Sequence, residues 1–201
     1  MKISALVPVK NLDIAKSRLA DVLSRNERRM FADLMLSDVV EVILKTPKIE
    51  KVFLVGDKQL SPKSGTFIIQ ENFNNGYNEA VSFALRDKRI ANSDAIVILP
   101  GDIPLITTEE IKNFIELSEK TGEISIIGER VKRSEGLLFQ VCYQFHKFLT
   151  LAFTGQSIKF GNFTCLSKLT IEKMLKEKAT WSSFSGSLKK VEKDLLSTPS
   201  V

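Results

Sequence analysis

The sequence predicts an α/β fold built as a single domain, with a mostly parallel, mixed sheet and helices on both of its faces. Short apolar segments alternate with amphipathic segments through residues 1–130, as expected where crossover helices connect parallel strands. The apolar segments are nearly continuous, which is typical of strands buried on both faces. The length of 201 residues suits one domain with its own core.

The first strand is expected over residues 3–9, and a long helix follows it. Ser24 and Glu27 form a capping box, in which each side chain bonds the backbone N–H of the other residue. The helix should end before Pro47, because the residue preceding proline avoids helical geometry. Its apolar positions recur at helical spacing and are Phe31, Leu34, Met35, Val39, Val42 and Ile43.

The rest of the alternation places four more strands and three more helices. The strands are expected at residues 52–55, 67–69, 95–99 and 124–127. The helices are expected at residues 76–87, from the capping box of Thr107 and Glu110 onward, and at residues 170–178. In the first of these helices Ala80, Phe83 and Ala84 should face inward. The pattern weakens after Gly128, but no linker separates the remainder, so it is interpreted as the second half of the same domain.

Composition excludes several classes of protein. Hydrophobic residues make up 43% and charged residues 26% of the chain, and no apolar run approaches the roughly 20 residues that cross a bilayer. Neither a membrane anchor nor a signal peptide is expected, which favours a cytoplasmic location. Cys142 and Cys165 lack the spacing of a disulfide framework or zinc site and should be buried. The net charge of +5 is spread among glutamates, so a small anionic substrate is preferred to nucleic acid.

A cationic loop directly after the first strand is the clearest functional signal. In residues 6–19 the strand meets Pro8, and Lys10, Lys16 and Arg18 follow. Open α/β sheets bind their ligands at the carboxyl ends of the strands. The loop therefore predicts a phosphate-binding site, and an ordinary solvated basic loop is the alternative.

Asp102 is the best candidate for a catalytic group. It follows the strand at residues 95–99 through Pro100 and Gly101, so it should point into the same crevice as the cationic loop. Magnesium binds through one or two carboxylates together with substrate phosphates. A turn aspartate that caps its local backbone is the alternative interpretation.

Asn78 and His146 complete the set of polar candidates. Asn78 lies where a loop enters a helix and offers both a donor and an acceptor, which suits a base or ribose; it equally suits a helix cap. His146 is the single histidine and is interpreted as structural. The sequence contains no G-x-S-x-G, Walker or G-x-G-x-x-G motif, which argues against hydrolases, P-loop enzymes and dinucleotide oxidoreductases.

Four stretches carry a resemblance to a known family: Pro8-Val9-Lys10 with Ala15-Lys16-Ser17-Arg18-Leu19; Leu23-Ser24 with Glu27-Arg28-Arg29 and Met35-Leu36-Ser37-Asp38-Val39; Asn78-Glu79-Ala80; and Leu99-Pro100-Gly101-Asp102-Ile103-Pro104-Leu105. The sequence resembles the guanylyltransferases of deazaflavin-coenzyme biosynthesis, which act on 2-phospholactate or phosphoenolpyruvate. They belong to the GT-A-like, Rossmann-like nucleotidyltransferases, which include the molybdenum-cofactor guanylyltransferases.

The resemblance implies a reaction between GTP and a small phosphorylated acid, with magnesium as cofactor. Residues 1–128 would form the nucleotide-binding half and residues 129–201 the acceptor-binding half. The implied nucleotide-binding residues are Pro8, Val9, Lys10, Lys16, Asn78 and Ala80. The implied catalytic residues are Lys16, Arg18 and Asp102, and Asp102 is also the implied metal ligand. A homodimer is left open.

The last third departs from the family pattern. A Gly-Thr-Asn motif is replaced by Gly136-Leu137-Leu138, although Thr154 and Ser157 can still bind the acceptor phosphate. The family's second metal carboxylate is replaced by Ser197, with Asp194 as the nearest substitute. Three explanations stay open: a divergent enzyme with another acceptor, a catalytically impaired nucleotide binder, and a reading-frame error near residue 134.

Overall fold

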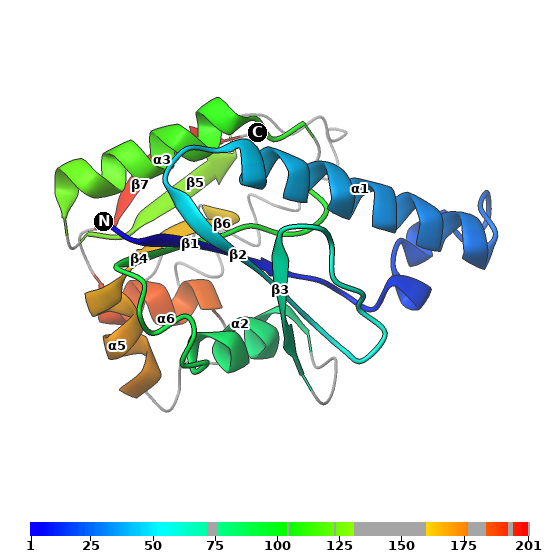
Figure 1. Cartoon of the computed structure of the whole chain (residues 1–201), viewed down its shortest axis with the longest axis horizontal. Coiled ribbons are helices and arrows are strands. Elements are labelled where there is room, and N and C mark those ends of the chain that lie inside the picture. Colours follow the sequence, from blue (N-terminus) through cyan, green and yellow to red (C-terminus); the bar gives the residue numbers. More distant parts are fainter. Residues whose placement is uncertain are drawn as a thin grey trace, which may run out of the picture.

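A seven-stranded mixed sheet lies between two layers of helices in the computed structural model (Figure 1). The structure describes residues 1–71, 76–103, 105–122, 124–130, 160–176, 184–192 and 195–200. The strands are β1 (Ile3–Pro8), β2 (Ile49–Gly56), β3 (Thr66–Gln70), β4 (Ala95–Ile98), β5 (Ile126–Arg130), β6 (Phe160–Ser167) and β7 (Leu196–Ser200). The helices are α1 (Arg25–Lys45), α2 (Tyr77–Leu85), α3 (Thr108–Thr121), α5 (Lys168–Lys176) and α6 (Phe184–Val191), with short 3-10 turns η1 (Leu12–Ile14) and η2 (Ser17–Leu19).

The sheet order is β3-β2-β1-β4-β6-β5-β7, and most of its neighbours are parallel. The exception is β6, which runs antiparallel to both β4 and β5, whereas β7 returns parallel to β5. The carboxyl ends of β1, β2, β3 and β4 therefore meet at one edge of the sheet. The α/β class, the mixed sheet and the helices on both faces are confirmed.

Two apolar clusters fill the space between the sheet and its helices. Helices α1 and α3 pack on one face, and α2, α5 and α6 pack on the other. All six residues of β1 are buried, because this strand lies between β2 and β4 with helices above and below. That environment explains why its sequence is apolar apart from Ser4.

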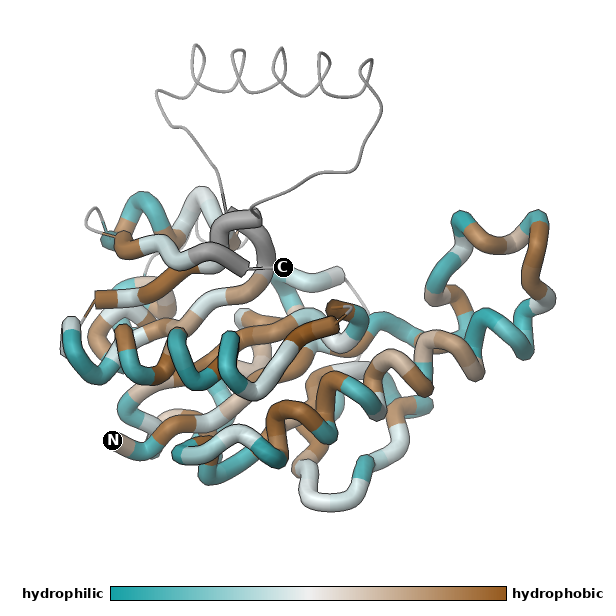
Figure 2. The backbone as a smooth tube through the Cα atoms, turned by 90° about the horizontal axis from the view of Figure 1, so that it is seen from above, coloured by the Kyte–Doolittle hydropathy of each residue, from teal (hydrophilic) through white to brown (hydrophobic). Residues whose placement is uncertain are grey.

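Helix α1 begins at the predicted capping box. The Ser24 hydroxyl accepts the Glu27 backbone N–H at 3.3 Å, and the Glu27 carboxylate accepts the Ser24 backbone N–H at 2.8 Å. The predicted apolar face was wrong in its first half, since Phe31 and Leu34 are 43% and 60% exposed. The amino-terminal half of α1 extends past the sheet (Figure 2), so Phe31 and Leu34 have no strand to pack on, and the loop after β1 lies beside this part of the helix. The buried positions are Ala32, Leu36, Val39, Val40 and Ile43.

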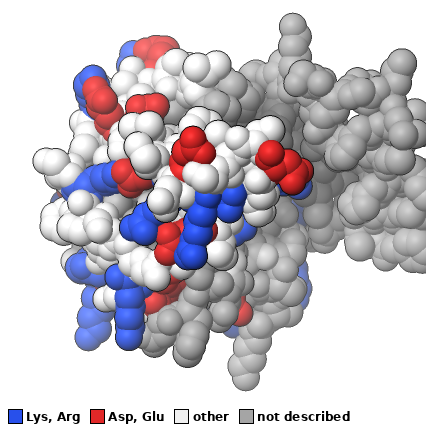
Figure 3. All heavy atoms as spheres, turned by 90° about the vertical axis from the view of Figure 1, so that its right-hand side faces the viewer, with Lys and Arg blue, Asp and Glu red and all other residues white. Residues whose placement is uncertain are grey.

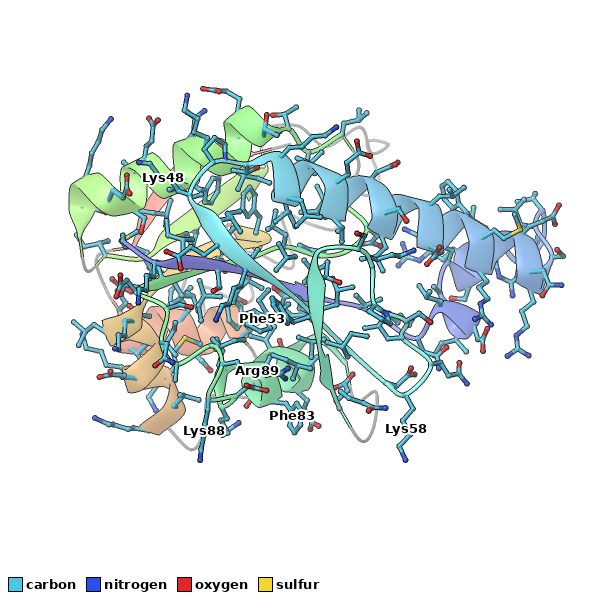
Figure 4. All side chains as sticks on the ribbon, in the orientation of Figure 1. Lys48, Phe53, Lys58, Phe83, Lys88 and Arg89 are labelled. Carbon is cyan, nitrogen blue, oxygen red and sulfur yellow. The ribbon has the colours of Figure 1, made fainter. Side chains whose placement is uncertain are left out.

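The edge strand β3 is covered by Arg89, which follows α2. The Arg89 guanidinium lies 5.8 Å from the centre of the Phe53 ring, pairs with Asp87 and donates to the Ile68 carbonyl at 3.1 Å. Figure 4 shows Arg89 beside Phe53, between β2 and α2. Phe83 of α2 is 44% exposed, so its predicted inward position was wrong. Ala80 and Ala84 are buried as predicted, because the helix packs closely on the sheet through small side chains.

A polar network ties β5, α5 and α6 together at the other edge of the sheet. Glu192, directly after α6, accepts the Ser125 backbone N–H at 3.0 Å and the Thr170 hydroxyl. The Ser125 hydroxyl in turn donates to the Thr170 hydroxyl at 2.9 Å. These bonds satisfy buried polar groups between elements that are far apart in sequence. Among the helices described, none has the length and hydropathy needed to span a bilayer.

Candidate functional site

A cavity of about 730 Å³ opens at the carboxyl edge of β1 and β4. It is lined by the loop after β1, the turn after β4, the start of α2, and residues of α1 and of the segment after β3. Figure 3 looks onto this edge and shows basic side chains lying among acidic ones. The sequence-predicted residues that line the cavity are Pro8, Val9, Lys10, Lys16, Arg18, Ala80 and Asp102.

The cationic loop wraps around the cavity in two short 3-10 turns. Between them Lys16 has φ 53° and ψ 35°, the left-handed region that costs a side-chain-bearing residue roughly 1–2 kcal/mol. Such backbone strain concentrates at functional sites, where surrounding contacts hold it in place. The turn brings Lys16 into the cavity lining together with Lys10 and Arg18.

Contacts to two elements hold this loop against the body of the protein. The Asp13 carboxylate accepts a hydrogen bond from the guanidinium of Arg29 of α1 at 2.9 Å, and it lies 3.5 Å from the Arg25 guanidinium. On the other side the Asn11 side-chain amide donates to the Asp57 carboxylate, after β2, at 2.7 Å. The loop is therefore positioned by α1 and β2 rather than by its own turns alone.

Asp102 lies opposite the cationic loop, as predicted. The Lys16 ammonium donates to the Asp102 carboxylate at 2.8 Å, and the two side chains are 22% and 59% exposed. Gly101 brings this turn close to α1, since a Cβ atom at Gly101 would lie 3.0 Å from a Leu36 methyl carbon. A larger residue at position 101 would require the Leu36 side chain or this turn to shift.

The residues present fit a divalent cation that arrives with its ligand. Within the described ranges, no three histidine, cysteine, aspartate or glutamate side chains form a group able to hold a metal. Asp102 is a single exposed carboxylate, and magnesium accepts one such ligand when phosphate oxygens and waters complete its octahedron. The donor set suits magnesium bound through a phosphorylated ligand.

The start of α2 forms one wall of the cavity. Gly76 precedes it with φ 101°, a conformation that favours glycine. Tyr77 lines the cavity, packs edge-on against Phe184 at 5.9 Å, and burial raises the pKa of its hydroxyl. Asn78 does not line the cavity, and its side-chain oxygen accepts the Phe184 backbone N–H at 3.2 Å. A nucleotide-binding role for Asn78 stays a prediction.

Sequence reasoning missed Glu71, which lines the cavity directly after β3. The residue is 4% exposed. Burial raises the pKa of its carboxyl, and the nearby carboxylates of Asp57 and Glu79 raise it further. The strand-end rule that singled out Asp102 applies equally to Glu71, so an acidic residue after the third strand was the available signal.

The remaining candidates lie in the second half of the chain. Thr154, Ser157, Asp194, His146, Cys142 and the segment 136–138 lie outside the described residues. Ser197 is exposed on β7 opposite Ile127, and β7 is three strands from β4. Cys165 is buried as predicted, and burial raises the pKa of its thiol to about 11.

The family model of CofC-like guanylyl transferases matches residues 3–189 of this sequence. The chain belongs to this family of guanylyl transferases. It is 31% identical over 142 residues to a phosphoenolpyruvate guanylyltransferase of Thermobaculum terrenum, covering 69% of this chain and 61% of that protein. It is also 31% identical to a 2-phospho-L-lactate guanylyltransferase of Methanococcoides burtonii, covering 57% of this chain and 51% of that protein. The matched region thus spans only about half to three fifths of the length of these relatives.

Solved structures support the nucleotidyltransferase fold of this family member. A CMP:2-keto-3-deoxy-manno-octonic acid synthetase complexed with CTP superposes with a TM-score of 0.61 at 10% identity, covering 100% of this chain and 90% of that chain. A Mycobacterium tuberculosis protein solved in complex with manganese gives a TM-score of 0.55 at 12% identity, with coverages of 100% and 90%.

Proposed function

We propose that this guanylyl transferase family member transfers GMP from GTP to a small phosphorylated acid and releases pyrophosphate, as a step of deazaflavin-coenzyme biosynthesis. The observation that carries the proposal is the meeting of Lys10, Lys16, Arg18 and Asp102 around one cavity. The acceptors to consider are 2-phospholactate, phosphoenolpyruvate and 3-phosphoglycerate. The first two appear in the names of the relatives. A cytoplasmic location and a homodimer remain predictions from sequence.

In this reaction a phosphate oxygen of the acceptor attacks the α-phosphorus of GTP. The new bond to phosphorus forms as the bond to the oxygen that bridges the α- and β-phosphates breaks, and pyrophosphate leaves. Two anions must approach each other, so the main obstacle is their repulsion. Lys10, Lys16 and Arg18 neutralise the phosphates and hold the attacking and leaving oxygens in line, and no protein nucleophile is needed.

The Lys16–Asp102 ion pair prepares both residues for this task. Magnesium held by Asp102 and phosphate oxygens would supply further neutralisation of the leaving pyrophosphate. The manganese complex of a structural neighbour is compatible with a divalent cation in this fold. When the triphosphate binds, Lys16 exchanges the Asp102 carboxylate for a phosphate oxygen. The left-handed backbone of Lys16 lies at the cavity lining, within reach of both partners.

The test is pyrophosphate release by the purified chain with GTP, magnesium and each of the three acids in turn. We expect release with one acid and much less when GTP is replaced by ATP, CTP or UTP. The matched variant Lys16→Met should lower the rate at least about tenfold, the loss expected for one charged hydrogen bond in the transition state. Absence of release with every acid would contradict the proposal.

A second candidate function is nucleotide binding without turnover. The departure at Ser197 favours it, since this residue is exposed on β7, three strands from β4, rather than beside Asp102. In that case GTP should raise the unfolding temperature while no acid yields pyrophosphate. Turnover with any acid would eliminate this candidate.

A further inference from the structure

Glu71 is a buried carboxyl group without a partner among the residues that the structure describes. The residue is 4% exposed and lines the cavity. No described residue forms an ion pair with its carboxylate or donates a hydrogen bond to it. A buried carboxylate without donors is costly. The protein retains this cost at the wall of the proposed site, which points to a ligand that supplies the missing donors.

The sheet places Glu71 at a particular distance from the phosphate-binding loop. Its backbone N–H donates to the Gly56 carbonyl at 2.9 Å, which fixes it at the carboxyl end of β3. In the order β3-β2-β1-β4 it lies two strands from the loop after β1 and three from Asp102. With strands about 4.8 Å apart, these separations are about 10 and 14 Å. A nucleotide with its phosphates at Lys16 and Asp102 would reach Glu71 with its base.

Among the described residues the neighbours of Glu71 form no metal site, and an N–H donor is the other partner that its carboxylate can take. Its acidic neighbours are Asp57 and Glu79. Asp57 already accepts the Asn11 amide and the Gln59 backbone N–H. Among the described residues, no three histidine, cysteine, aspartate or glutamate side chains are arranged to hold a cation. Glu71 is thus an acceptor in the cavity lining to which no described residue donates a hydrogen bond.

We propose that Glu71 reads the base of the bound nucleotide by accepting the two adjacent N–H groups on the Watson–Crick edge of guanine. This inference rests on the proposed function. Guanine presents its ring N1–H beside its 2-amino group, which matches a bidentate carboxylate. Adenine and cytosine present an amino group beside an unprotonated ring nitrogen, whose lone pair faces the second carboxylate oxygen. Uracil presents one N–H between two carbonyls. Glu71 therefore selects GTP over the other three nucleotides.

The test compares GTP with inosine triphosphate, which retains N1–H and lacks the 2-amino group. Binding to the full chain is measured by titration calorimetry with magnesium present. The wild-type protein should bind GTP about tenfold to a hundredfold more tightly than inosine triphosphate, the difference expected for one hydrogen bond to a charged group. In Glu71→Gln the side-chain NH₂ meets one N–H of guanine, so GTP affinity should fall by a similar factor and the preference should largely disappear.

Glu79→Gln is the matched control. It removes a neighbouring carboxylate that does not line the cavity, and it should keep the wild-type preference for GTP. An unchanged ratio of GTP to inosine triphosphate affinity in Glu71→Gln would overturn the inference. This ratio does not depend on the fraction of folded protein, so partial unfolding of the variant cannot imitate the effect.

Parallel pyrophosphate assays separate this inference from the proposed function. If the wild type and Glu71→Gln both turn over GTP and have the same ratio of GTP to inosine triphosphate affinity, the role of Glu71 alone is overturned. If Glu71→Gln loses the preference for GTP and the wild type shows no turnover, base reading is supported and the transferase reaction alone is overturned.

Discussion

At the scale of single residues, the site depends on charged side chains whose partners change when a ligand binds. Lys16 and Asp102 pair with each other at 2.8 Å. Both are partly exposed, so their pairing contributes at most about 1 kcal/mol to stability. Substitutions at these two positions should therefore leave the fold intact and act on ligand binding.

Asp102→Asn should remove most of the magnesium dependence of GTP binding. Without magnesium, the variant should bind GTP as well as the wild type or better, because a carboxylate near the triphosphate is removed and Lys16 is released. With magnesium, the affinity of the wild type for GTP should rise about tenfold or more, whereas the affinity of Asp102→Asn should change little. Titration calorimetry with and without magnesium measures this difference. Asp38→Asn, on the exposed side of α1, is the control, and equal magnesium effects in all three proteins would refute a metal at Asp102.

Glu71→Gln should stabilise the ligand-free protein at neutral pH. The raised pKa of Glu71 means that the folded protein binds this proton more readily than the unfolded chain. The contribution of the protonated Glu71 carboxyl to stability is complete below the ordinary glutamate pKa of 4.5. It is lost as the pH rises through the pKa of Glu71 in the folded protein. The variant should therefore unfold at a higher temperature than the wild type at neutral pH, and the gap should close on acidification. Thermal unfolding at several pH values measures this difference in unfolding temperature, with the exposed Glu172→Gln as control. A difference that does not depend on pH would contradict a raised pKa of Glu71.

At the scale of elements, local signals in the sequence predicted local structure well. The capping boxes at Ser24 and Thr107 set the first turns of α1 and α3, because such bonds depend on residues only three positions apart. The strands β1 and β4 were visible as continuous or nearly continuous apolar runs for the same reason. Glu71 and the inward face of the first half of α1 were not predicted, since both depend on which elements lie beside them.

Strand β6 shows why the second half was harder to predict. It enters the sheet between β4 and β5 and is antiparallel to both. Its buried residues include Thr164 and Ser167, so the nearly continuous apolar pattern seen in β1 and β4 is broken. The Ser167 backbone N–H donates to the Ser125 hydroxyl at 3.2 Å, a contact between residues far apart in the sequence that only the fold creates.

Glu192→Ala should destabilise the junction of β5, α5 and α6. Removal of the carboxylate leaves the Ser125 N–H and the Thr170 hydroxyl without their acceptor, and one buried group left unsatisfied costs about 1–3 kcal/mol. We expect a loss of about 2–3 kcal/mol in the free energy of unfolding, measured by urea denaturation. The exposed Glu172→Ala on α5 should change it by less than about 0.5 kcal/mol. Equal effects of the two substitutions would show that the network contributes nothing.

At the scale of the whole molecule, one sheet joins the part of the chain that lines the site to the part that follows it. Phe163 and Cys165 of β6 lie in the same apolar cluster as Val7 of β1 and Leu36 of α1. The Phe163 ring also stacks on Phe114 of α3 with 3.8 Å between centroids. Separation of the two halves would expose this shared core, so the single-domain prediction implies that neither half unfolds alone.

Thermal and urea unfolding should therefore show one cooperative transition for the whole chain. Hydrogen exchange should give similar opening free energies for the most protected amides of β1, β4 and β6, because all three open only when the shared core is lost. Saturating GTP with magnesium should raise these free energies together by about 2.7 kcal/mol at a hundredfold excess over the dissociation constant, although the ligand contacts residues before position 103. If β6 exchanged at lower free energy than β1, or gained no protection from GTP, the two halves would be independent units. The nucleotide site would then need no support from the last third of the chain.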